Sequence, residues 1–420
     1  MSRIGESLIV KPMDILFVVP YVPSLVRVRP YNFIRSLSRL GHRVTVLTLW
    51  SDEREREEAV RLQAECHAVR AVHLPRWRAA VNSLRALPTR APIQASYSWQ
   101  PELISPRALA GLNPDVIHVE HLRGARYGLA LRHWSRQFGA PRPIIWDSVD
   151  CISLLFRHAA ARSRRLLNRL ITRFELGRTE RYEGWLLGQF ERSLVTSRID
   201  RQALLALAKD QNAAPGKPDL RVIPNGVDLA YFGLETGEPR EPATLVLSGK
   251  MSYHANVTMV THFVREILPR VRARRPEVKL WVVGKEPTPE IQALAADPAI
   301  IVTGTVADMR PYLQRATLAV APVAYGVGIQ NKVLEAMACG TPVVSTPQSV
   351  SALDLQPGRD VMVADQPEAF ADTVTRLLDN PDWRGAIGQA GRRYVETHHD
   401  WDHIAGRLED TYHGVNAYAG

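Results

Sequence analysis

Residues 325–347 (YGVGIQNKVLEAMACGTPVVSTP) hold the side chains best suited to bind a phosphorylated ligand. A glycine-containing loop at 326–328 leads into an expected helix that begins at Asn331. The free backbone N–H groups and the positive dipole end of such a helix form an anion site. Lys332 adds a charge suited to a diphosphate, and Glu335 can accept hydroxyl hydrogen bonds from a ribose or a sugar. The alternative is a capped helix with a surface ion pair between Lys332 and Glu335.

A second segment, Ser248 to Asn256 (SGKMSYHAN), follows an apolar run that predicts a buried strand. Gly249 allows the backbone to approach a ligand closely, and Lys250 lies where parallel sheets bind phosphates. An ordinary strand–helix loop with a solvated lysine is the alternative.

Short apolar runs alternate with amphipathic stretches along the chain, a pattern typical of parallel sheets covered by helices. Two series of strands are expected: 14–19, 44–48, 116–119, 144–146 and 194–196, then 244–248, 280–283, 300–302, 318–321 and 343–345. Expected helices are 29–40, a long helical stretch at 157–190, then 256–274, 309–314, 331–339, 367–379 and 382–409.

Two consecutive strand–helix series predict an α/β protein with two doubly wound, Rossmann-like domains. The expected organisation is a tail at 1–12, an N-terminal domain at 13–225, a C-terminal domain at 226–395, and a final helical segment at 396–420 that packs back toward the N-terminal domain. Open parallel sheets bind ligands beyond the carboxyl ends of their strands, so two facing domains would place the site in the cleft between them.

Composition narrows the function classes. The 420 residues contain three cysteines, which are too few and too dispersed for a disulfide framework or a zinc site. Residues 1–225 hold 35 Lys and Arg against 20 Asp and Glu, whereas the remainder is mildly acidic. This asymmetry favours an anionic partner for the first domain. Nucleic-acid binding would demand interleaved basic and aromatic residues on one surface, and no such run is seen.

The sequence shows no run of about 18 apolar residues and no signal-peptide pattern, so a cytoplasmic protein is expected. An arginine-rich stretch could lie on an anionic membrane surface at the inner face of the cell membrane, or bind a polyprenyl diphosphate. A solvated helix face is the alternative. Its members are Arg157, Arg162, Arg164, Arg165, Arg169, Arg173, Arg178 and Arg181.

The chain resembles the retaining glycosyltransferases of family 4, which have the GT-B fold. The resemblance rests on SGKMSYHAN, on GVGIQNKVLEAMACGTPVVST and on VIPNGVD at 222–228, and it extends over nearly the whole chain. The LEAMACGTPVV run is its most specific part. The N-terminal sequence and WDSVDCISLL at 146–155 are most similar to the branch linked to exopolysaccharide and exosortase-associated sugar transfer.

The resemblance implies a donor site in the C-terminal domain. Glu335 matches the glutamate that holds the nucleotide ribose, and Lys250 stands where the family usually has an arginine on the donor diphosphate. The residues expected to bind the donor are Gly249, Lys250, Gly326, Gly328, Ile329, Gln330, Asn331, Lys332 and Glu335.

In the N-terminal domain, DVIHVEH at 115–121 resembles a strand whose end supplies a histidine near the reacting sugar. His121 is favoured because it lies past the strand end, and with Lys250 and Glu335 it completes the expected catalytic set. The further candidates on the acceptor side are Tyr21, His118, Glu120, Asp147 and Asp150. Each of them could instead be a core or surface residue without a ligand.

Three departures from the family pattern stand out. Val327 occupies the position of a glutamate that usually contacts the donor sugar, so Gln330 or Asn331 would have to replace it. The expected second cation after Lys250 falls on Ala255 or Asn256, and Lys332 is our candidate replacement. The loop at 20–24 lacks the glycine pair of many relatives.

The resemblance implies transfer of a sugar from a UDP- or GDP-linked donor to a glycan or polyprenyl-diphosphate-linked acceptor in polysaccharide biosynthesis. It implies front-side attack without a protein nucleophile, no cofactor and no bound metal. Two rivals remain: a nucleotide-sugar 2-epimerase on the same fold, and a nucleotide- or glycan-binding relative without turnover, which Val327 keeps open.

Overall fold

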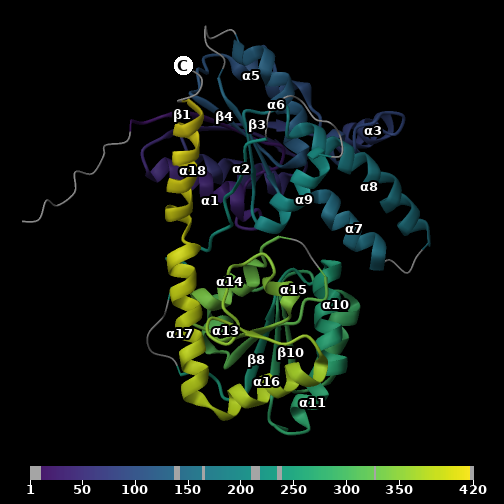
Figure 1. Ribbon diagram of the computed structural model, residues 1–420, viewed down its shortest axis with the longest axis vertical. Coiled ribbons are helices and arrows are strands. Elements are labelled where there is room, and N and C mark those ends of the chain that lie inside the picture. Colours follow the sequence, from purple (N-terminus) through teal and green to yellow (C-terminus); the bar gives the residue numbers. More distant parts are fainter. Residues whose placement is uncertain are drawn as a thin grey trace, which may run out of the picture. The chain divides into compact units, whose positions relative to one another are not determined.

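The computed structural model (Figure 1) describes residues 11–136, 142–162, 166–209, 218–233, 239–325 and 328–416, without the side chains of 159–172 and 416. The described chain forms two compact units. Unit 1 runs up to Val195 and includes Arg201–Arg221 and the residues from Ala405 onward. Unit 2 comprises Thr196–Asp200 and Val222–Ile404. The expected tail at 1–12 lies almost wholly outside the described residues.

Unit 1 contains a seven-stranded sheet in the order β3-β2-β1-β4-β5-β6-β7. Its central strand β1 is buried from Ile15 to Val19 and pairs in parallel with β2 and β4, as a strand covered on both faces should. The strands are β1 (Asp14–Val19), β2 (Arg43–Trp50), β3 (Ala68–His73), β4 (Val116–Glu120), β5 (Ile144–Val149), β6 (Arg192–Val195) and β7 (Leu220–Val222).

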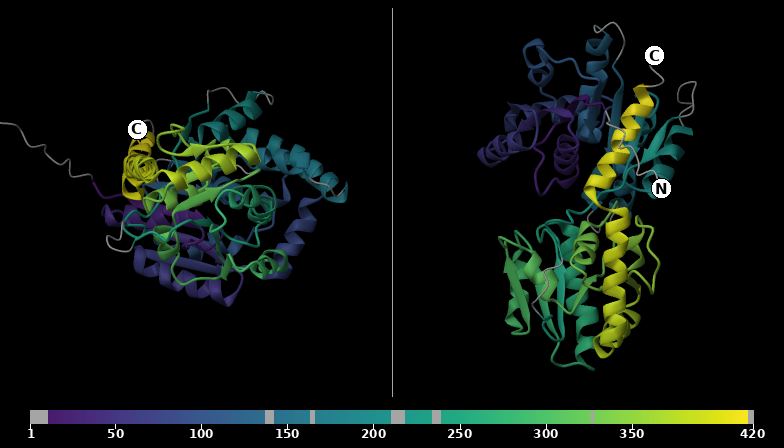
Figure 2. Two further views of the ribbon diagram at one scale, coloured as in Figure 1. Left: turned by 90° about the horizontal axis from the view of Figure 1, so that it is seen from below. Right: turned by 90° about the vertical axis from the view of Figure 1, so that its left-hand side faces the viewer.

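Helices cover both faces of this sheet (Figures 1 and 2). They are α1 (Val28–Arg39), α2 (Glu53–Leu62), α3 (Arg76–Ala86), α4 (Ile93–Ser96), α5 (Pro106–Leu109), α6 (His121–Ser135), α7 (Ile152–Arg162), α8 (Leu166–Leu186) and α9 (Arg198–Lys209). The last helix, α18 (Trp401–Asn416), also belongs mainly to unit 1. Its Tyr412 hydroxyl lies 2.8 Å from Nδ1 of His118, and its Glu409 lies 3.0 Å from Nε2 of His42.

Unit 2 has a six-stranded sheet in the order β10-β9-β8-β11-β12-β13. The strands are β8 (Thr244–Ser248), β9 (Lys279–Val283), β10 (Ile300–Gly304), β11 (Leu318–Ala321), β12 (Val343–Ser345) and β13 (Met362–Val363). The helices are α10 (His254–His262), α11 (Leu268–Arg272), α12 (Pro289–Gln292), α13 (Arg310–Arg315), α14 (Asn331–Ala338), α15 (Pro347–Val350), α16 (Pro367–Asp379) and α17 (Pro381–His398).

The expectation of two doubly wound α/β domains is confirmed, and the differences lie in individual elements. Strands β3 and β7 were not predicted, because β3 (AVRAVH) is only half-buried and carries a central arginine, while β7 has three residues. The long helical stretch at 157–190 is two helices, α7 and α8, which pack against each other.

The predicted helix at 382–409 is also interrupted. His399 leaves the helical conformation between α17 and α18, and its carbonyl accepts a 2.7 Å hydrogen bond from Val227 N. Its ring contacts the carbonyl of Asn225 at 2.7 Å. Gly226 lies against the segment at His399, and a Cβ there would come within 2.8 Å of the His399 carbonyl oxygen. Packing within unit 2 therefore requires a glycine at the end of the turn 224–226.

Candidate functional site

In unit 2, the strand order changes direction at β8, which is flanked by β9 on one side and β11 on the other. Both neighbours run parallel to β8, so the loops after β8 and β11 leave the same edge of the sheet. In an open parallel sheet, this reversal opens the crevice that binds ligands. The two segments singled out in the sequence, 248–256 and 325–347, follow these two strands.

Two glycines allow the loops after β8 and β9 to meet. Gly249 has φ of 146° and Gly284 has φ of 151°, a region that favours glycine. A Cβ at Gly284 would overlap the carbonyl oxygen of Gly249. Positions 249 and 284 could not carry a side chain without a clash. The backbone next to Lys250 therefore lies close against the backbone of the loop after β9.

Lys250 is half-exposed, and its Nζ lies 2.9 Å from Oε2 of Glu286. This contact lowers the pKa of Glu286 from its usual value. The buried side chain of Asn256 donates a 2.9 Å hydrogen bond to the Lys250 carbonyl. Asn256, one of the two positions expected for a second cation, therefore holds the backbone of the lysine loop in place.

Lys332 and Glu335 lie on the first turns of α14, both half-buried. Burial lowers the pKa of Lys332 to about 8, opposed by Glu335, and burial raises the pKa of Glu335 to about 6, opposed by Lys332. These two described side chains form no ion pair within 4.0 Å; Lys332 Nζ instead donates a 3.1 Å hydrogen bond to Oε1 of Gln330. The surface ion pair considered as an alternative is not formed.

The start of α14 supplies one further polar atom. Asn331 Oδ1 is buried and has no hydrogen-bond partner among the described residues. Gly328 has φ of 71° and Ile329 is buried in the core of unit 2. Gly326 and Val327 lie outside the described residues.

Tyr325 was not identified from the sequence. Its hydroxyl lies 2.8 Å from Nδ1 of His254 and 3.3 Å from Oγ1 of Thr258, and its ring stacks on the His254 ring. The contact ties the loop after β11 to α10. The loop after β11 and helix α10 both lie beside the switch point. The position of Tyr325 directly before the glycine loop was therefore the sequence signal that could have identified it.

Unit 1 has an equivalent switch point between β1 and β4, where a second polar group lies. Tyr21, just after β1, donates a 2.8 Å hydrogen bond to Oε1 of Glu120, the last residue of β4. Glu120 is buried and its Oε2 has no partner among the described atoms. Burial, reinforced by the charge of Asp147, raises the pKa of Glu120 to about 8. The Glu120 carboxyl group is therefore mainly in its neutral form at pH 7.

His118 and Asp147 are fully buried inside unit 1, so neither is exposed to contact an acceptor in this structure. Arg29 Nε donates a 2.8 Å hydrogen bond to Asp147 Oδ2, and the same oxygen lies 3.6 Å from His118 Nε2. Although burial opposes it, the Arg29 charge holds the pKa of Asp147 below its usual range. Burial lowers the pKa of His118.

His121 begins α6 with φ of 65°, outside the usual range for a side-chain-bearing residue. Its carbonyl accepts a 3.3 Å hydrogen bond from Trp146 Nε1, and its ring meets Tyr21 edge to face. Burial, with the nearby charge of Arg123, lowers the pKa of His121 to about 3. The imidazole is therefore neutral at physiological pH and lies beside Tyr21 and Glu120.

Asp150 follows the end of β5 and is half-buried, with its backbone N donating to the Ser148 carbonyl at 2.9 Å. The preceding Val149 has φ of 68°, and its N donates a 3.0 Å hydrogen bond to Asp147 Oδ1. Buried Glu183, not identified from the sequence, accepts hydrogen bonds from the N–H groups of Ile152 and Ser153 at the start of α7.

The four described arginine side chains of the arginine-rich stretch differ in their surroundings. Arg178 is buried and pairs with Glu175 at 2.7 Å, and Arg157 pairs with Glu180 at 2.7 Å. Arg173 and Arg181 are exposed. Arg164 and Arg165 lie outside the described residues, and the side chains of Arg162 and Arg169 are not described.

Neither a membrane-spanning helix nor a metal cluster appears in the described parts of the chain. No helix among those residues is long and apolar enough to cross a bilayer. The same residues contain no group of three or more His, Cys, Asp or Glu side chains placed to hold a metal ion.

Two family models match consecutive parts of the chain. Residues 26–231 match the model described as Glycosyltransferase Family 4, and residues 242–380 match the model described as Glycosyl transferases group 1. The first covers most of the N-terminal strand–helix series, and the second contains both segments at the unit 2 switch point.

Two individual relatives and one solved structure each share less than a third of their aligned residues with this chain. The chain is 29% identical to a D-inositol 3-phosphate glycosyltransferase of Frankia alni, over 68% of this chain and 72% of that one. It is 27% identical to a GDP-mannose-dependent monoacylated alpha-(1-6)-phosphatidylinositol monomannoside mannosyltransferase of Corynebacterium glutamicum, over 48% of this chain and 58% of that one. The structure of Anabaena HepE in complex with UDP and glucose has a similar fold, with a TM-score of 0.67, 14% identity, and coverage of 96% and 100%.

Proposed function

Since the chain is a glycosyltransferase built from the two Rossmann-like domains of family 4, we propose that it transfers a sugar from a nucleotide-sugar donor to a glycan or lipid-linked acceptor with retention at the anomeric carbon. The relatives support a UDP- or GDP-linked donor, because one is GDP-mannose-dependent and one solved structure contains UDP and glucose. A role in exopolysaccharide assembly is part of the proposal.

The observation that carries this proposal is the placement of Lys250 on the loop after β8, and of Lys332 and Glu335 on helix α14 after β11, on both sides of the unit 2 switch point. Lys332 and the N–H groups at the start of α14 supply positive charge for a diphosphate. With its pKa at about 6, Glu335 is mainly ionised at neutral pH and can accept two hydroxyl hydrogen bonds from a ribose.

Departure of the nucleoside diphosphate builds negative charge on its oxygens while the sugar becomes oxocarbenium-like. Preorganised cations at those oxygens stabilise that transition state more than the ground state. Lys250 and Lys332 take this role in our proposal, with Lys250 exchanging its contact with Glu286 for one with the diphosphate. The departing diphosphate takes the acceptor proton during front-side attack, so no protein nucleophile or cofactor is needed.

The polar group at the unit 1 switch point is assigned to the acceptor side. His121, Tyr21 and Glu120 present a neutral imidazole, a phenol and a mostly neutral carboxyl group, which suit hydrogen bonding to sugar hydroxyls. Buried His118 and Asp147 do not contact the acceptor in this assignment; Asp147 instead accepts a hydrogen bond from Val149 N, and Asp150 shapes the adjoining loop. We place the enzyme at the inner face of the cell membrane as a peripheral protein.

The first experiment is the melting temperature with UDP, GDP, TDP and ADP added in turn. A nucleotide at a hundredfold its Kd should stabilise the protein by about 2.7 kcal/mol. One nucleotide should shift wild type but not Glu335→Gln, while Glu290→Gln, at an exposed carboxylate of unit 2, should respond like wild type. No shift with any nucleotide would contradict the donor site and favour a relative without turnover.

Release of free sugar or a sugar-transfer product from the matching nucleotide sugar then separates an enzyme from a binding protein. Epimerisation of the donor at C2 without transfer would instead support the 2-epimerase rival.

A further inference from the structure

Unit 1 contains a cavity of about 470 Å³ that the proposed donor and acceptor groups do not use. Its walls come from helices α3, α6 and α8, from the end of α4, and from the segments that follow α3 and α4. The polar and aromatic side chains that matter are Arg78, Arg85, Arg126, Asn82, Trp99 and Tyr182. Among the described residues, no carboxylate lines the cavity.

The three guanidinium groups have no protein anion to neutralise them. Among the described residues, none of Arg78, Arg85 and Arg126 forms an ion pair within 4.0 Å, and Arg78 Nε is buried without a hydrogen-bond partner. Arg85 and Arg126 are exposed to solvent, and Arg78 is half-buried. An anion bound at this concave surface would reduce the repulsion among the three positive charges.

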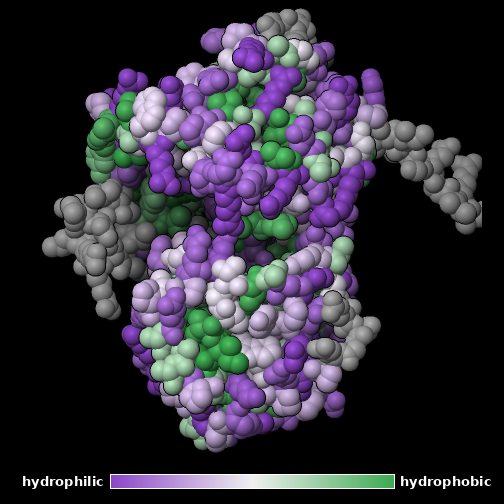
Figure 3. All heavy atoms as spheres, turned by 180° about the vertical axis from the view of Figure 1, so that it is seen from behind, coloured by the Kyte–Doolittle hydropathy of each residue, from purple (hydrophilic) through white to green (hydrophobic). Residues whose placement is uncertain are grey.

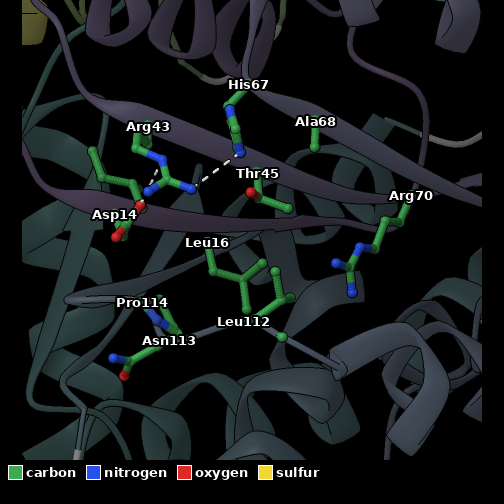
Figure 4. Close-up of a pocket in the computed structure, with 12 residues that line it drawn as sticks. Asp14, Leu16, Arg43, Thr45, His67, Ala68, Arg70, Leu112, Asn113 and Pro114 are labelled. Carbon is green, nitrogen blue, oxygen red and sulfur yellow. Dashed lines mark hydrogen bonds and ion pairs between the residues drawn. The ribbon is translucent and has the colours of Figure 1, made fainter.

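A second cavity of unit 1 provides the contrast (Figure 4). It has a volume of about 280 Å³ and lies at the amino ends of the strands, where Arg43 contacts Asp14 at 3.3 Å and His67 at 3.3 Å. Its other arginine, Arg70, donates to the carbonyls of Ala108 and Ala110. The cations of that cavity are satisfied by the protein itself.

The wall of the larger cavity is held rigidly. The Arg126 guanidinium lies 4.2 Å above the Trp99 ring, which packs against Tyr127. Asn82 Nδ2 donates hydrogen bonds of 3.0 Å and 2.8 Å to the carbonyls of Tyr97 and Trp99. These contacts fix Arg126 and α3 before any ligand arrives, which lowers the entropy lost on binding.

The turn after α3 is fixed from behind. Arg178 donates to the carbonyls of Ala86, Thr89 and Ala91, and all three of these residues line the cavity. Arg178 itself is neutralised by Glu175, so it is a structural cation that leaves the cavity's own charge unchanged.

We propose that this cavity, the arginine pocket, is a second anion site that binds a phosphate ester or diphosphate. Guanidinium groups match phosphate oxygens through paired N–H donors, and three of them suit a group with two or more negative charges. The Tyr182 hydroxyl adds an uncharged donor at the wall. The proposal does not depend on the donor site, which lies in unit 2.

The surface around the arginine pocket bears on the source of the phosphoryl group. Trp77 and Leu84 on α3, and Leu87 just after it, are exposed by 62%, 65% and 45%. In the space-filling view of Figure 3, hydrophobic side chains gather in small patches on a mostly hydrophilic face. A phosphorylated lipid would contact both kinds of surface, whereas a soluble phosphorylated glycan would contact the arginines alone.

The test is calorimetric binding of pyrophosphate to the full chain. Wild type should bind it with a strong salt dependence, and the double substitution of Arg85→Gln and Arg126→Gln should weaken binding by about tenfold or more, since each removes charged hydrogen bonds. A control with Arg54→Gln and Arg61→Gln together removes two charges at exposed sites on α2 and should bind as wild type does. Nucleotide-induced shifts in melting temperature should persist in the double variant, which shows that it folds and that the donor site is separate.

Binding to vesicles of phosphatidylglycerol and phosphatidylcholine distinguishes a lipid phosphate from a soluble phosphate as the ligand. Loss of both pyrophosphate and vesicle binding in the double variant assigns the arginine pocket to a lipid phosphate; loss of pyrophosphate binding alone assigns it to a soluble one. Unchanged pyrophosphate binding in the double variant, or its loss only in Lys250→Gln, would overturn the proposal while leaving the donor site intact.

Discussion

The hydroxyl of Tyr21 donates a 2.8 Å hydrogen bond to Glu120, joining the ends of two adjacent parallel strands at the switch point of unit 1. The residues are far apart in sequence but are brought together because β1 and β4 pair in parallel. The other oxygen of Glu120 is buried and has no hydrogen bond among the described residues, so the carboxyl group retains the capacity to accept or donate one more.

Substitution Glu120→Gln should make the protein less sensitive to alkaline pH. The pKa of Glu120 is raised to about 8 in the folded chain, so the folded state binds a proton more tightly than the unfolded one. Its contribution to stability is present at low pH and is lost as the pH rises from about 4.5 through 8. At pH 9 the loss for wild type should be on the order of 5 kcal/mol relative to the variant.

Urea unfolding of both proteins between pH 5 and pH 9 measures this difference. Parallel pH profiles for wild type and Glu120→Gln would show that the carboxyl group ionises with an ordinary pKa. Tyr21→Phe serves as a second variant, because it removes the hydroxyl that stabilises the ionised form and should extend the loss of stability to higher pH.

Glu335 should give nucleoside binding an inflection near pH 6. Because the ionised carboxylate is the better acceptor for ribose hydroxyls, affinity should fall by several-fold as the pH drops through about 6. Titration with uridine or guanosine, which lack phosphates that titrate in this range, isolates the effect. Glu335→Gln should bind more weakly and show no inflection there; an inflection retained in that variant would assign it to another group.

Lys332→Ala should weaken binding of the nucleoside diphosphate by about tenfold, since one charged hydrogen bond is lost. The nucleoside without phosphates should bind the variant and wild type equally. Lys279→Ala, at an exposed lysine that begins β9, is the matched control. Unchanged diphosphate affinity in Lys332→Ala would reject Lys332 as the replacement for the missing second cation.

Gly284→Ala should destabilise unit 2 by about 2 kcal/mol or more. The new Cβ would overlap the Gly249 carbonyl, and φ of 151° is unfavourable for alanine. Gly385→Ala makes the same change inside α17, where no atom lies within 4 Å of the new Cβ. It should stabilise the protein by roughly 0.5 to 1 kcal/mol.

Thermal unfolding of the two alanine variants checks both signs. Equal melting temperatures would show that the backbones at Gly249 and Gly284 can separate freely. The same Gly284→Ala protein should lose nucleotide binding, because the displaced loop carries Lys250.

Elements with a continuous apolar run were predictable from the sequence. The strands β1, β8, β11 and β12 have the predicted bounds, since a buried parallel strand carries a near-continuous apolar run. Helix α16 also has the predicted bounds. The edge strand β3 was missed because a half-buried strand needs no such run.

The site residues likewise divide into those that the sequence predicted and those that only the structure identified. The positions of Lys250 and Glu335 after β8 and β11 follow from motif order along the chain. The Tyr325 contact with His254, the capping of α7 by Glu183 and the cations of the arginine pocket join residues distant in sequence, and no local pattern marks them.

The sequence by itself determined the class of fold, the family and the loops that carry the donor-site residues, because these depend on hydrophobic periodicity and on short-range motifs. Only the tertiary structure decided which charges are neutralised. It buries His118 and Asp147 beside Arg29, turns Arg178 inward to Glu175, and leaves Arg78, Arg85 and Arg126 without an anion. The physical reason is that the energy of a charge depends on its partners and on its burial, and packing between distant segments sets both.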